Sequence, residues 1–507
     1  MISTNRKYDV VIIGSGLGGM VCAAVLSKEG KRVCVLEKNE QIGGSLQTFR
    51  REGVTFDTGV HYIGGLSKDS TLYKIFNYLG IMERLETLRM NEQGFDVVAF
   101  KDDVSEYPFG MGYDNFKAIL AARFPGDINA IETYCRDMQR ICSSVPLYNL
   151  QPEDGYNDMS IFTTSVKHYF EALTTNKKLQ NVLAGTNLLY AGTPLTPLYV
   201  HALVVNSYIE GAYKIKNGGD QIVKLMARII KENGGEVLRM HAVKSIDVES
   251  GVAKSVTLEG GEVIEGDVFI SNLHPAQTLK ITQTDAIRPA YRSRIADLPN
   301  SVSTFVLYVI LKPGSMPFRN RNYYYFNDED VWNATGHTDD NWPLMYAMFE
   351  EVPEKQNEFV EAFTVMTYMR FDEVAQWKDT EHTTLNENER SESYQQFKRQ
   401  KAEKLLDVME IKFPGLHSSI QSYYTSTPLS YRDYMGTDDG SMYGIVKDYN
   451  EPVKTMISVK TKVPNLLLTG QNVGLHGVLG VTESALLTCG AIMGKEYLLD
   501  KIKAANP

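Results

Sequence analysis

A run of apolar, mostly β-branched residues leads directly into a glycine cluster near the start of the chain, in YDVVIIGSGLGGM (8–20). Tyr8–Ile13 has the composition of a strand buried on both faces of a parallel sheet. Gly14, Gly16 and Gly19 then form a G-x-G-x-x-G pattern, which permits a tight turn, close approach to a pyrophosphate, and close packing of a helix on the strand. We expect that helix over about 18–28, with its positive N-terminal end facing phosphate groups.

A carboxylate ends the next apolar run, RVCVLE (32–37). Glu37 lies about 20 residues beyond the glycine cluster, where an acid accepts hydrogen bonds from a ribose diol and repels a 2′-phosphate. Strand, glycines, helix, strand and acid in this order are far more specific than the glycines alone, which could form a turn that binds nothing. The segment therefore predicts a dinucleotide site in an α/β unit.

Length, charge and motifs restrict the rest of the chain. A chain of 507 residues is expected to form more than one structural unit, and a net charge of −10 makes nucleic acid a poor partner. No apolar run is long enough to span a bilayer, and the N-terminus does not resemble a signal peptide. The five cysteines have no metal-binding spacing, and HExxH and GxSxG are absent. We expect a cytoplasmic protein without a metal site or hydrolytic activity.

A glycine pair, Gly43-Gly44, follows Glu37 in EKNEQIGGSLQTF (37–49). Here the chain resembles the FAD-binding fold of the glutathione-reductase and amine-oxidase type, in which such a pair makes a second backbone contact to the diphosphate. The resemblance implies FAD rather than a nicotinamide cofactor alone. Amine oxidases usually carry arginine after the pair, whereas Ser45 stands there in this chain.

The stretch FDTGVHYIGG (Phe56–Gly65) narrows the resemblance further. It is similar to the phytoene desaturase, carotenoid isomerase and retinol saturase family, and most of all to the all-trans-retinol 13,14-reductase-like branch. The segments Gly211–Val237, Thr427–Ile445 and Asn465–Gly494 are similar to the same family.

The family resemblance also implies the cofactor contacts. In the closing segment, a strand delivers Gly470 and Gln471 to the cofactor, and a helix starting near Val481 directs its N–H groups at the flavin N1–C2=O edge. A backbone contact to adenine is implied near Val243. The full set of predicted cofactor contacts is Gly14, Ser15, Gly16, Leu17, Gly18, Gly19, Glu37, Lys38, Gly43, Gly44, Ser45, Val243, Gly470, Gln471, Gly480 and Val481.

The predicted fold class is α/β, with a Rossmann-like FAD-binding domain and an inserted α+β substrate domain. Residues 1–95, 212–290 and 455–507 are expected to form the discontinuous FAD domain. Residues 96–211 and 291–454 are expected to form the substrate domain. The stretch from 234 to 272 alternates like a strand meander that returns to the core through DVFISN (267–272).

Four residues are candidates for catalysis, each with an ordinary structural alternative. His61 could be a wall of the flavin pocket or a proton donor, or else a packed histidine bonded to backbone. Tyr62 is more readily a stacked wall than an acid. His476 and Glu483 flank the closing loop, and Glu483 could equally stabilise the first turn of the following helix.

The sequence thus predicts an FAD-dependent oxidoreductase acting on C=C bonds of an apolar polyene or isoprenoid, by hydride exchange at flavin N5. Saturation, desaturation and isomerisation share this apparatus. The alternatives are an amine oxidase-like enzyme and, less favoured, a flavin-bearing lipid-binding protein without turnover. We also expect an external electron donor or acceptor, and peripheral contact with a membrane from which lipid is drawn.

Overall fold

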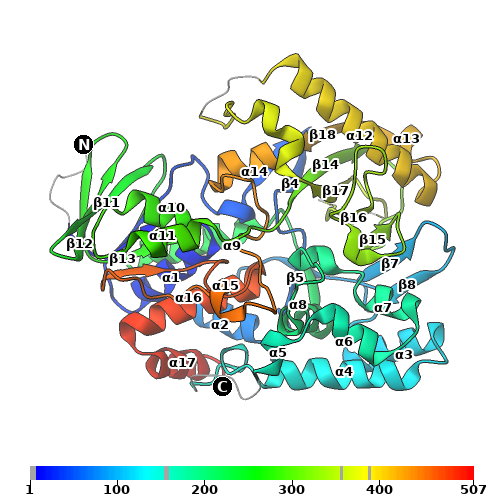
Figure 1. Cartoon of the computed structure of the whole chain (residues 1–507), viewed down its shortest axis with the longest axis horizontal. Helices are drawn as coiled ribbons and strands as arrows, with labels where there is room; N and C mark the ends of the chain where they lie inside the picture. Colours follow the sequence, from blue (N-terminus) through cyan, green and yellow to red (C-terminus); the bar gives the residue numbers. More distant parts are fainter. Residues whose placement is uncertain (1–6, 153–158, 354–357, 386–389) are drawn as a thin grey trace.

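Two seven-stranded sheets, each covered by helices, lie side by side along the long axis of the molecule (Figure 1). The structure is a computed structural model that describes residues 7–152, 159–353, 358–385 and 390–507. The first six residues, which contribute to the expected absence of a signal peptide, lie outside the described part of the chain.

The first sheet combines a parallel part with an antiparallel meander. Its strand order is β10-β2-β1-β13-β12-β11, with β19 pairing with β13. The pairs β10–β2, β2–β1, β1–β13 and β13–β19 are parallel, and β11–β12–β13 is the antiparallel meander predicted from the sequence. The strands are β1 Tyr8–Ile13, β2 Val33–Leu36, β10 Glu236–Leu238, β11 Val243–Glu249, β12 Val252–Leu258, β13 Val263–Ser271 and β19 Leu466–Leu468.

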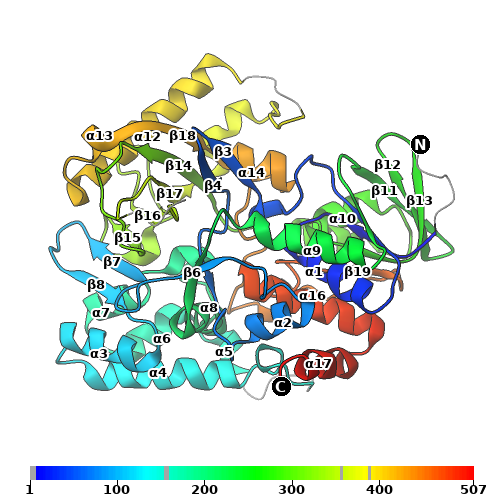
Figure 2. The same cartoon turned by 180° about the vertical axis from the view of Figure 1, so that it is seen from behind.

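Strand β1 forms because both of its faces are buried. Val10 and Ile12 pack into one apolar cluster, whereas Val11 and Ile13 pack into another on the opposite face. The first cluster includes residues of α1, α9 and α16, which lie together beneath the sheet (Figure 2). The helices of this part are α1 Leu17–Lys28, α2 Thr71–Leu79, α9 Asp220–Glu232, α10 Pro275–Ile281, α11 Pro289–Ala296, α16 Gly477–Met493 and α17 Lys495–Ala504.

The second sheet has the order β18-β14-β17-β16-β15-β7-β8 and is antiparallel except for the pair β15–β7. It draws one hairpin from the first quarter of the chain and its other strands from residues beyond 300. The strands are β7 Asp96–Phe100, β8 Glu106–Phe109, β14 Ser303–Leu311, β15 Asn322–Phe326, β16 Met345–Glu350, β17 Ala362–Met369 and β18 Ile420–Ser426.

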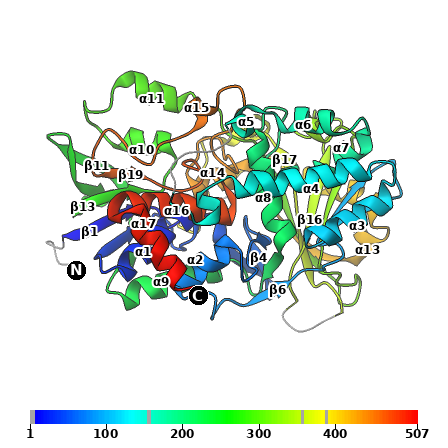
Figure 3. The ribbon, with the colours of Figure 1, turned by 90° about the horizontal axis from the view of Figure 1, so that it is seen from below.

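Helices cover both faces of the second sheet. Along β14, Val306 and Tyr308 join one apolar cluster, while Phe305 and Leu307 join the other, as the two-residue period of a strand requires. Figure 3 shows α4 and α8 lying across one face. Helix α12 (Glu392–Lys412) covers the other face with its buried residues. Other helices of this part are α3 Tyr113–Arg123, α4 Ile128–Ser143, α5 Ser160–Thr163, α6 Val166–Leu173, α7 Lys177–Leu183, α8 Leu198–Glu210, α13 Leu416–Ser419, α14 Pro428–Met435 and α15 Pro452–Thr455.

Short strands join the two sheets. One small sheet holds β5 (Ile63–Gly64), β9 (Ala212–Ile215) and β6 (Thr87–Arg89). A hairpin of β3 (Thr48–Arg51) and β4 (Val54–Asp57) precedes it. The numerical boundaries of the two predicted domains remain a prediction.

None of the helices in the described part of the chain is, by itself, long and apolar enough to cross a bilayer. Helices α16 and α17 pass that test only as a pair, and they are bent by 119° at the break between them.

Candidate cofactor site and adjoining cavities

The glycine cluster forms a tight turn between β1 and α1. Gly14 adopts a φ of +92°, which favours glycine, and its N–H donates to the Leu36 carbonyl at 2.8 Å. A Cβ on Gly19 would lie 2.2 Å from the Gly14 carbonyl oxygen, so only glycine lets the helix approach the strand this closely. Helix α1 begins at Leu17, and no side chain caps its N-terminus. Its first N–H groups therefore remain available to a ligand.

Glu37 lies 5% exposed at the end of β2 and binds the glycine turn. Its carboxylate accepts hydrogen bonds from the Ser15 N–H at 3.0 Å, the Ser15 hydroxyl at 2.5 Å and the Asn39 N–H at 2.8 Å. A carboxylate has about four lone-pair sites, so capacity remains for a ribose hydroxyl.

The second glycine pair packs directly against the first cluster. Gly43 and Gly44 adopt φ values of +117° and +57°, and a Cβ on Gly44 would lie 3.2 Å from Gly16 Cα. The Gly43 N–H donates to the Ser15 hydroxyl at 3.2 Å. The two glycine segments therefore form one continuous backbone surface.

Helix α14 covers this surface from the second part of the molecule. Lys38 donates to the Asp433 carbonyl at 2.7 Å, and the hydroxyl of Ser45 lies 3.9 Å from the sulfur of Met435. Burial lowers the pKa of Lys38. The structure thus assigns the Lys38 ammonium to holding α14, whereas its contact with a cofactor remains a prediction.

Asn272 is a residue at this site that sequence reasoning missed. It directly follows β13, and its side chain touches three glycines: Gly16, Gly18 and Gly470 would each place a Cβ within 2.7 Å of its amide atoms. The available signal was a polar residue at the carboxyl end of a strand that neighbours β1, where ligands of α/β sheets bind.

Val243, the predicted adenine contact, begins β11 and pairs with Leu258. The loop before it reaches Glu37, because the His241 N–H donates to the Glu37 carbonyl at 2.7 Å. Val243 therefore lies on the chain segment beside the acid.

The closing segment returns to the glycine cluster through the turn that follows β19. Gly470 (φ +94°) follows β19, and its Cα would lie 2.9 Å from a Cβ on Gly18. Helix α16 begins at Gly477, so the prediction of a start near Val481 was wrong by about one turn. The chain folds back tightly here: a Cβ on Gly480 would lie 2.6 Å from Leu475 Cβ, so the glycine permits an earlier helical start. Gly480 therefore lies in the first turn of α16 and Val481 directly follows that turn, and no side chain caps the helix.

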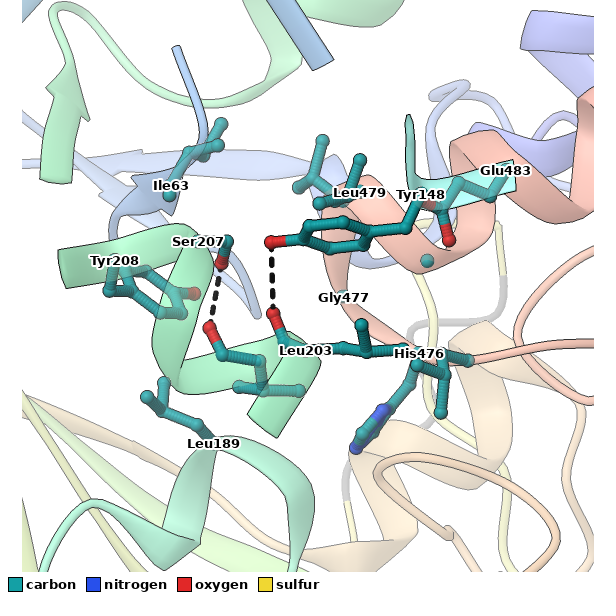
Figure 4. Close-up of a pocket in the computed structure, with 15 residues that line it drawn as sticks. Ile63, Tyr148, Leu189, Leu203, Ser207, Tyr208, His476, Gly477, Leu479 and Glu483 are labelled. Carbon is teal, nitrogen blue, oxygen red and sulfur yellow. Dashed lines mark hydrogen bonds between the residues drawn. The ribbon is translucent and has the colours of Figure 1, made fainter. Parts of the chain in front are cut away.

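A cavity lies between the first turn of α16 and helix α8. Its lining includes Ile63, Leu203, Ser207 and Tyr208 on one side and the segment from Leu475 to Gly480 on the other (Figure 4). Its volume is about 50 Å³, enough for a few water molecules and too small for a polyene, so a longer ligand requires side chains to move.

Glu483 lines this cavity and has an unusual environment. It is 8% exposed, and its Oε1 is buried without a hydrogen-bond partner among the described residues. Burial raises the pKa of its carboxyl to about 8. It lies in the second turn of α16, so the alternative that it stabilises the first turn does not hold.

His476 immediately precedes α16 and lines this cavity as well as a second one, which also contains Gln471. Its ring contacts Tyr443 edge-on at 4.3 Å between centroids. Burial, and then the nearby Lys447 ammonium, lower the pKa of His476 to about 3, so the imidazole is neutral at ordinary pH.

The other two candidates lie on the far side of β5. The His61 ring stacks on Phe349 at 4.6 Å, and both of its nitrogens are buried without a partner in the described structure. The backbone-bonded alternative for His61 is therefore wrong. Tyr62 donates to Asp96 at 2.8 Å and lies 2.7 Å from the Tyr324 hydroxyl, which commits its hydroxyl to the second sheet.

Comparison with known proteins decides the family. A model of the flavin containing amine oxidoreductases matches residues 17–493. The chain belongs to this family. Its fold also matches a crystal structure of an oxidoreductase from Methanosarcina mazei, with a TM-score of 0.63 at 15% identity over 94% of this chain and 98% of that one.

Three similar proteins have names that belong to the retinol saturase, carotenoid isomerase and phytoene desaturase group, which the Phe56–Gly65 stretch resembles. All-trans-retinol 13,14-reductase of Rattus norvegicus is 27% identical over 98% of this chain and 87% of the relative. Prolycopene isomerase of Daucus carota is 24% identical over 87% and 72%. A 4,4′-diapophytoene desaturase of Methylomonas sp is 24% identical over 60% and 61%. These matches confirm the predicted resemblance, and the reductases cover more of the chain than the other two.

The site fits FAD, the cofactor that the match with the flavin containing family supports. The N-terminus of α1 has no side-chain cap, and its Gly18 lies against Gly470, the glycine that follows β19. Helix α16 begins further along the same segment, at Gly477, and has no side-chain cap either. Glu37 supplies the acceptor for a ribose. The residue-by-residue contacts to FAD stay predictions.

We predict that Gly19→Ala weakens FAD binding, because the added methyl group would collide with the Gly14 carbonyl and push α1 away from β1. Overpacking of this kind costs about 1–3 kcal/mol, or roughly a 5- to 150-fold loss of affinity. The ratio of flavin to protein absorbance after purification, and titration of the apoprotein with FAD, measure it.

Gly126→Ala is the matched control, since Gly126 has no atom within 4 Å of the added Cβ and no positive φ. Equal FAD affinity of the two variants would contradict the assigned role of Gly19.

Proposed function

We propose that this protein is an FAD-dependent oxidoreductase that acts on a C=C bond of an apolar polyene or isoprenoid. The observation that carries the proposal is the match with retinol reductases along 98% of the chain, together with a cavity at the N-terminus of α16 that has an aliphatic wall and one carboxyl group. Among saturation, desaturation and isomerisation, the broader coverage by the reductases favours saturation.

When bound, the flavin supplies hydride exchange with one carbon of the double bond. The chain itself provides the surroundings. Leu203, Val204 and Leu475 offer an apolar wall that orients an isoprenoid chain and excludes water. The first turn of α16 has no side-chain cap, so its N–H groups and positive dipole end would hold the edge of the flavin and stabilise negative charge there.

Glu483 holds the proton that the neighbouring carbon requires. Because burial keeps its carboxyl protonated near neutral pH, it can donate into the cavity without first being charged. A buried carboxyl oxygen without a hydrogen-bond partner lowers the stability of the fold. Proteins often retain such a group where it takes part in the chemistry of a site.

Oxidation of an amine is the second candidate, favoured by the name of the family model. A protonated amine would need a negative partner. The only carboxyl among the residues that line the two cavities is Glu483, which is uncharged at neutral pH, and the second cavity contains a lysine. The geometry therefore favours the C=C reaction.

The proposal includes an external redox partner and transient contact with a membrane surface, because an apolar substrate is stored in lipid. Cytoplasmic localisation belongs to the same proposal.

We expect dithionite-reduced protein to be reoxidised anaerobically by all-trans-retinol, with the polyene absorption band moving to shorter wavelength as a double bond is lost. Flavin and polyene spectra recorded together measure both changes. If the polyene isomerises while the flavin stays reduced, the reaction assigned to the protein becomes isomerisation instead of saturation. Hydrogen peroxide formation with amines, and no response to polyenes, would contradict the proposal.

We predict that Glu483→Gln lowers the rate of the C=C reaction by about 10²- to 10⁴-fold, because the amide cannot donate the proton. In the wild type, the rate falls as pH rises through about 8, where the carboxyl ionises. The variant loses this dependence. Steady-state rates between pH 6 and about 9, with FAD content checked by absorbance, measure it.

A stability measurement accompanies this test. The folded-state pKa of about 8 exceeds the ordinary value of 4.5, so wild-type stability falls as pH rises between these values. Glu483→Gln removes this loss, whereas Glu496→Gln on the exposed face of α17 leaves it unchanged. An unchanged rate profile in Glu483→Gln would overturn the role of the carboxyl.

A further inference from the structure

The second cavity contains the one ammonium group among the residues that line the two cavities. Aliphatic residues, tyrosines and Glu483 line the first, whereas Lys447 and Gln471 line the second together with apolar side chains such as Val200 and Ile445. Both share Leu475 and His476, so the two cavities adjoin at the loop before α16. The polar members of the second cavity are Tyr190, Thr196, Ser301, Tyr443, Lys447 and Gln471.

Lys447 is a cation without a counter-ion in this cavity. Its ammonium donates to the backbone carbonyls of Asn472 at 3.3 Å and Thr455 at 3.2 Å, which leaves one of its three N–H donors uncommitted. Within the described part of the chain, the Lys447 ammonium forms no ion pair with a carboxylate. Burial alone lowers the pKa of Lys447 to about 8, so it is mostly charged at neutral pH.

An unpaired ammonium in a partly buried site is costly unless a ligand compensates its charge. A carboxylate would do so through a charge-assisted hydrogen bond. A hydroxyl could accept the free N–H but would leave the charge uncompensated, and a hydrocarbon could do neither. The neighbouring His476 is neutral, so it offers a hydrogen bond without competing for the anion.

We propose that the second cavity binds a carboxylate at one end of the substrate, with Lys447 as its ion-pair partner. This rests on the proposed function and narrows its substrate class to an isoprenoid chain that carries a carboxylic acid. The cavities have volumes of about 30 and 50 Å³, so side chains must move to admit the ligand, and the apolar chain would then extend past Leu475 and His476 into the first cavity, beside Glu483.

Binding to the FAD-loaded, oxidised protein tests the proposal without turnover. The probes are all-trans-retinoic acid, its uncharged methyl ester, all-trans-retinol and β-carotene, each titrated while the flavin absorbance is followed. We expect the acid to bind at least about 10-fold more tightly than the ester or the alcohol, as expected for a desolvated charge pair.

Substitutions assign the preference to Lys447. Lys447→Met should abolish the preference for the acid, and Lys447→Arg, which keeps the charge, should retain it. Lys460→Met, at an exposed lysine, is the matched control and should behave as the wild type.

Equal binding of acid, ester and alcohol by the wild type would overturn the proposal, and this comparison does not depend on any variant folding. Retention of the preference in Lys447→Met would overturn it too. Failure of the C=C reaction itself would leave the binding result standing, so the two proposals fail separately.

Discussion

The Glu37 residue joins the three chain segments of which the cofactor site is made. Its carboxylate binds both the N–H and the hydroxyl of Ser15, and that hydroxyl accepts the N–H of Gly43. Its own backbone N–H donates to Leu238 and its carbonyl accepts from His241. The buried carboxylate therefore fixes the first glycine turn and, through Ser15, the second glycine pair before any ribose is bound, whereas the backbone of Glu37 holds the strand beside them. Loss of the carboxylate would release the two glycine segments and leave the backbone bonds in place.

The elements that depend on local pattern could be predicted from the sequence. Strand β1 and helix α1 follow from the apolar run and the glycine spacing, and the meander follows from its alternation and turns. The contacts between residues that lie far apart in the chain could not be predicted from the sequence. Asn272 contacts glycines that are far from it in the chain, and Lys447 meets His476 only across a cavity. The start of α16 was missed because its glycines resemble a loop, and only tight packing on Leu475 makes them helical.

The same apparatus serves relatives named for reduction, isomerisation and desaturation. Glu483 lines one cavity and Lys447 lines the other, and the two cavities share Leu475 and His476. We propose that together they hold an acid-bearing polyene by its end and protonate it, and that they disfavour a cationic amine.

The central claim is that the cofactor places its flavin ring at the first turn of α16, facing the cavity that contains Glu483. A crystal structure of the FAD-loaded protein tests it most directly. We expect the diphosphate against Gly14–Gly19 and Gly43–Gly44, a ribose on Glu37, and the ring between Gly480 and the cavity. A flavin ring directed away from α16, with protein between the ring and the cavity, would rule this placement out.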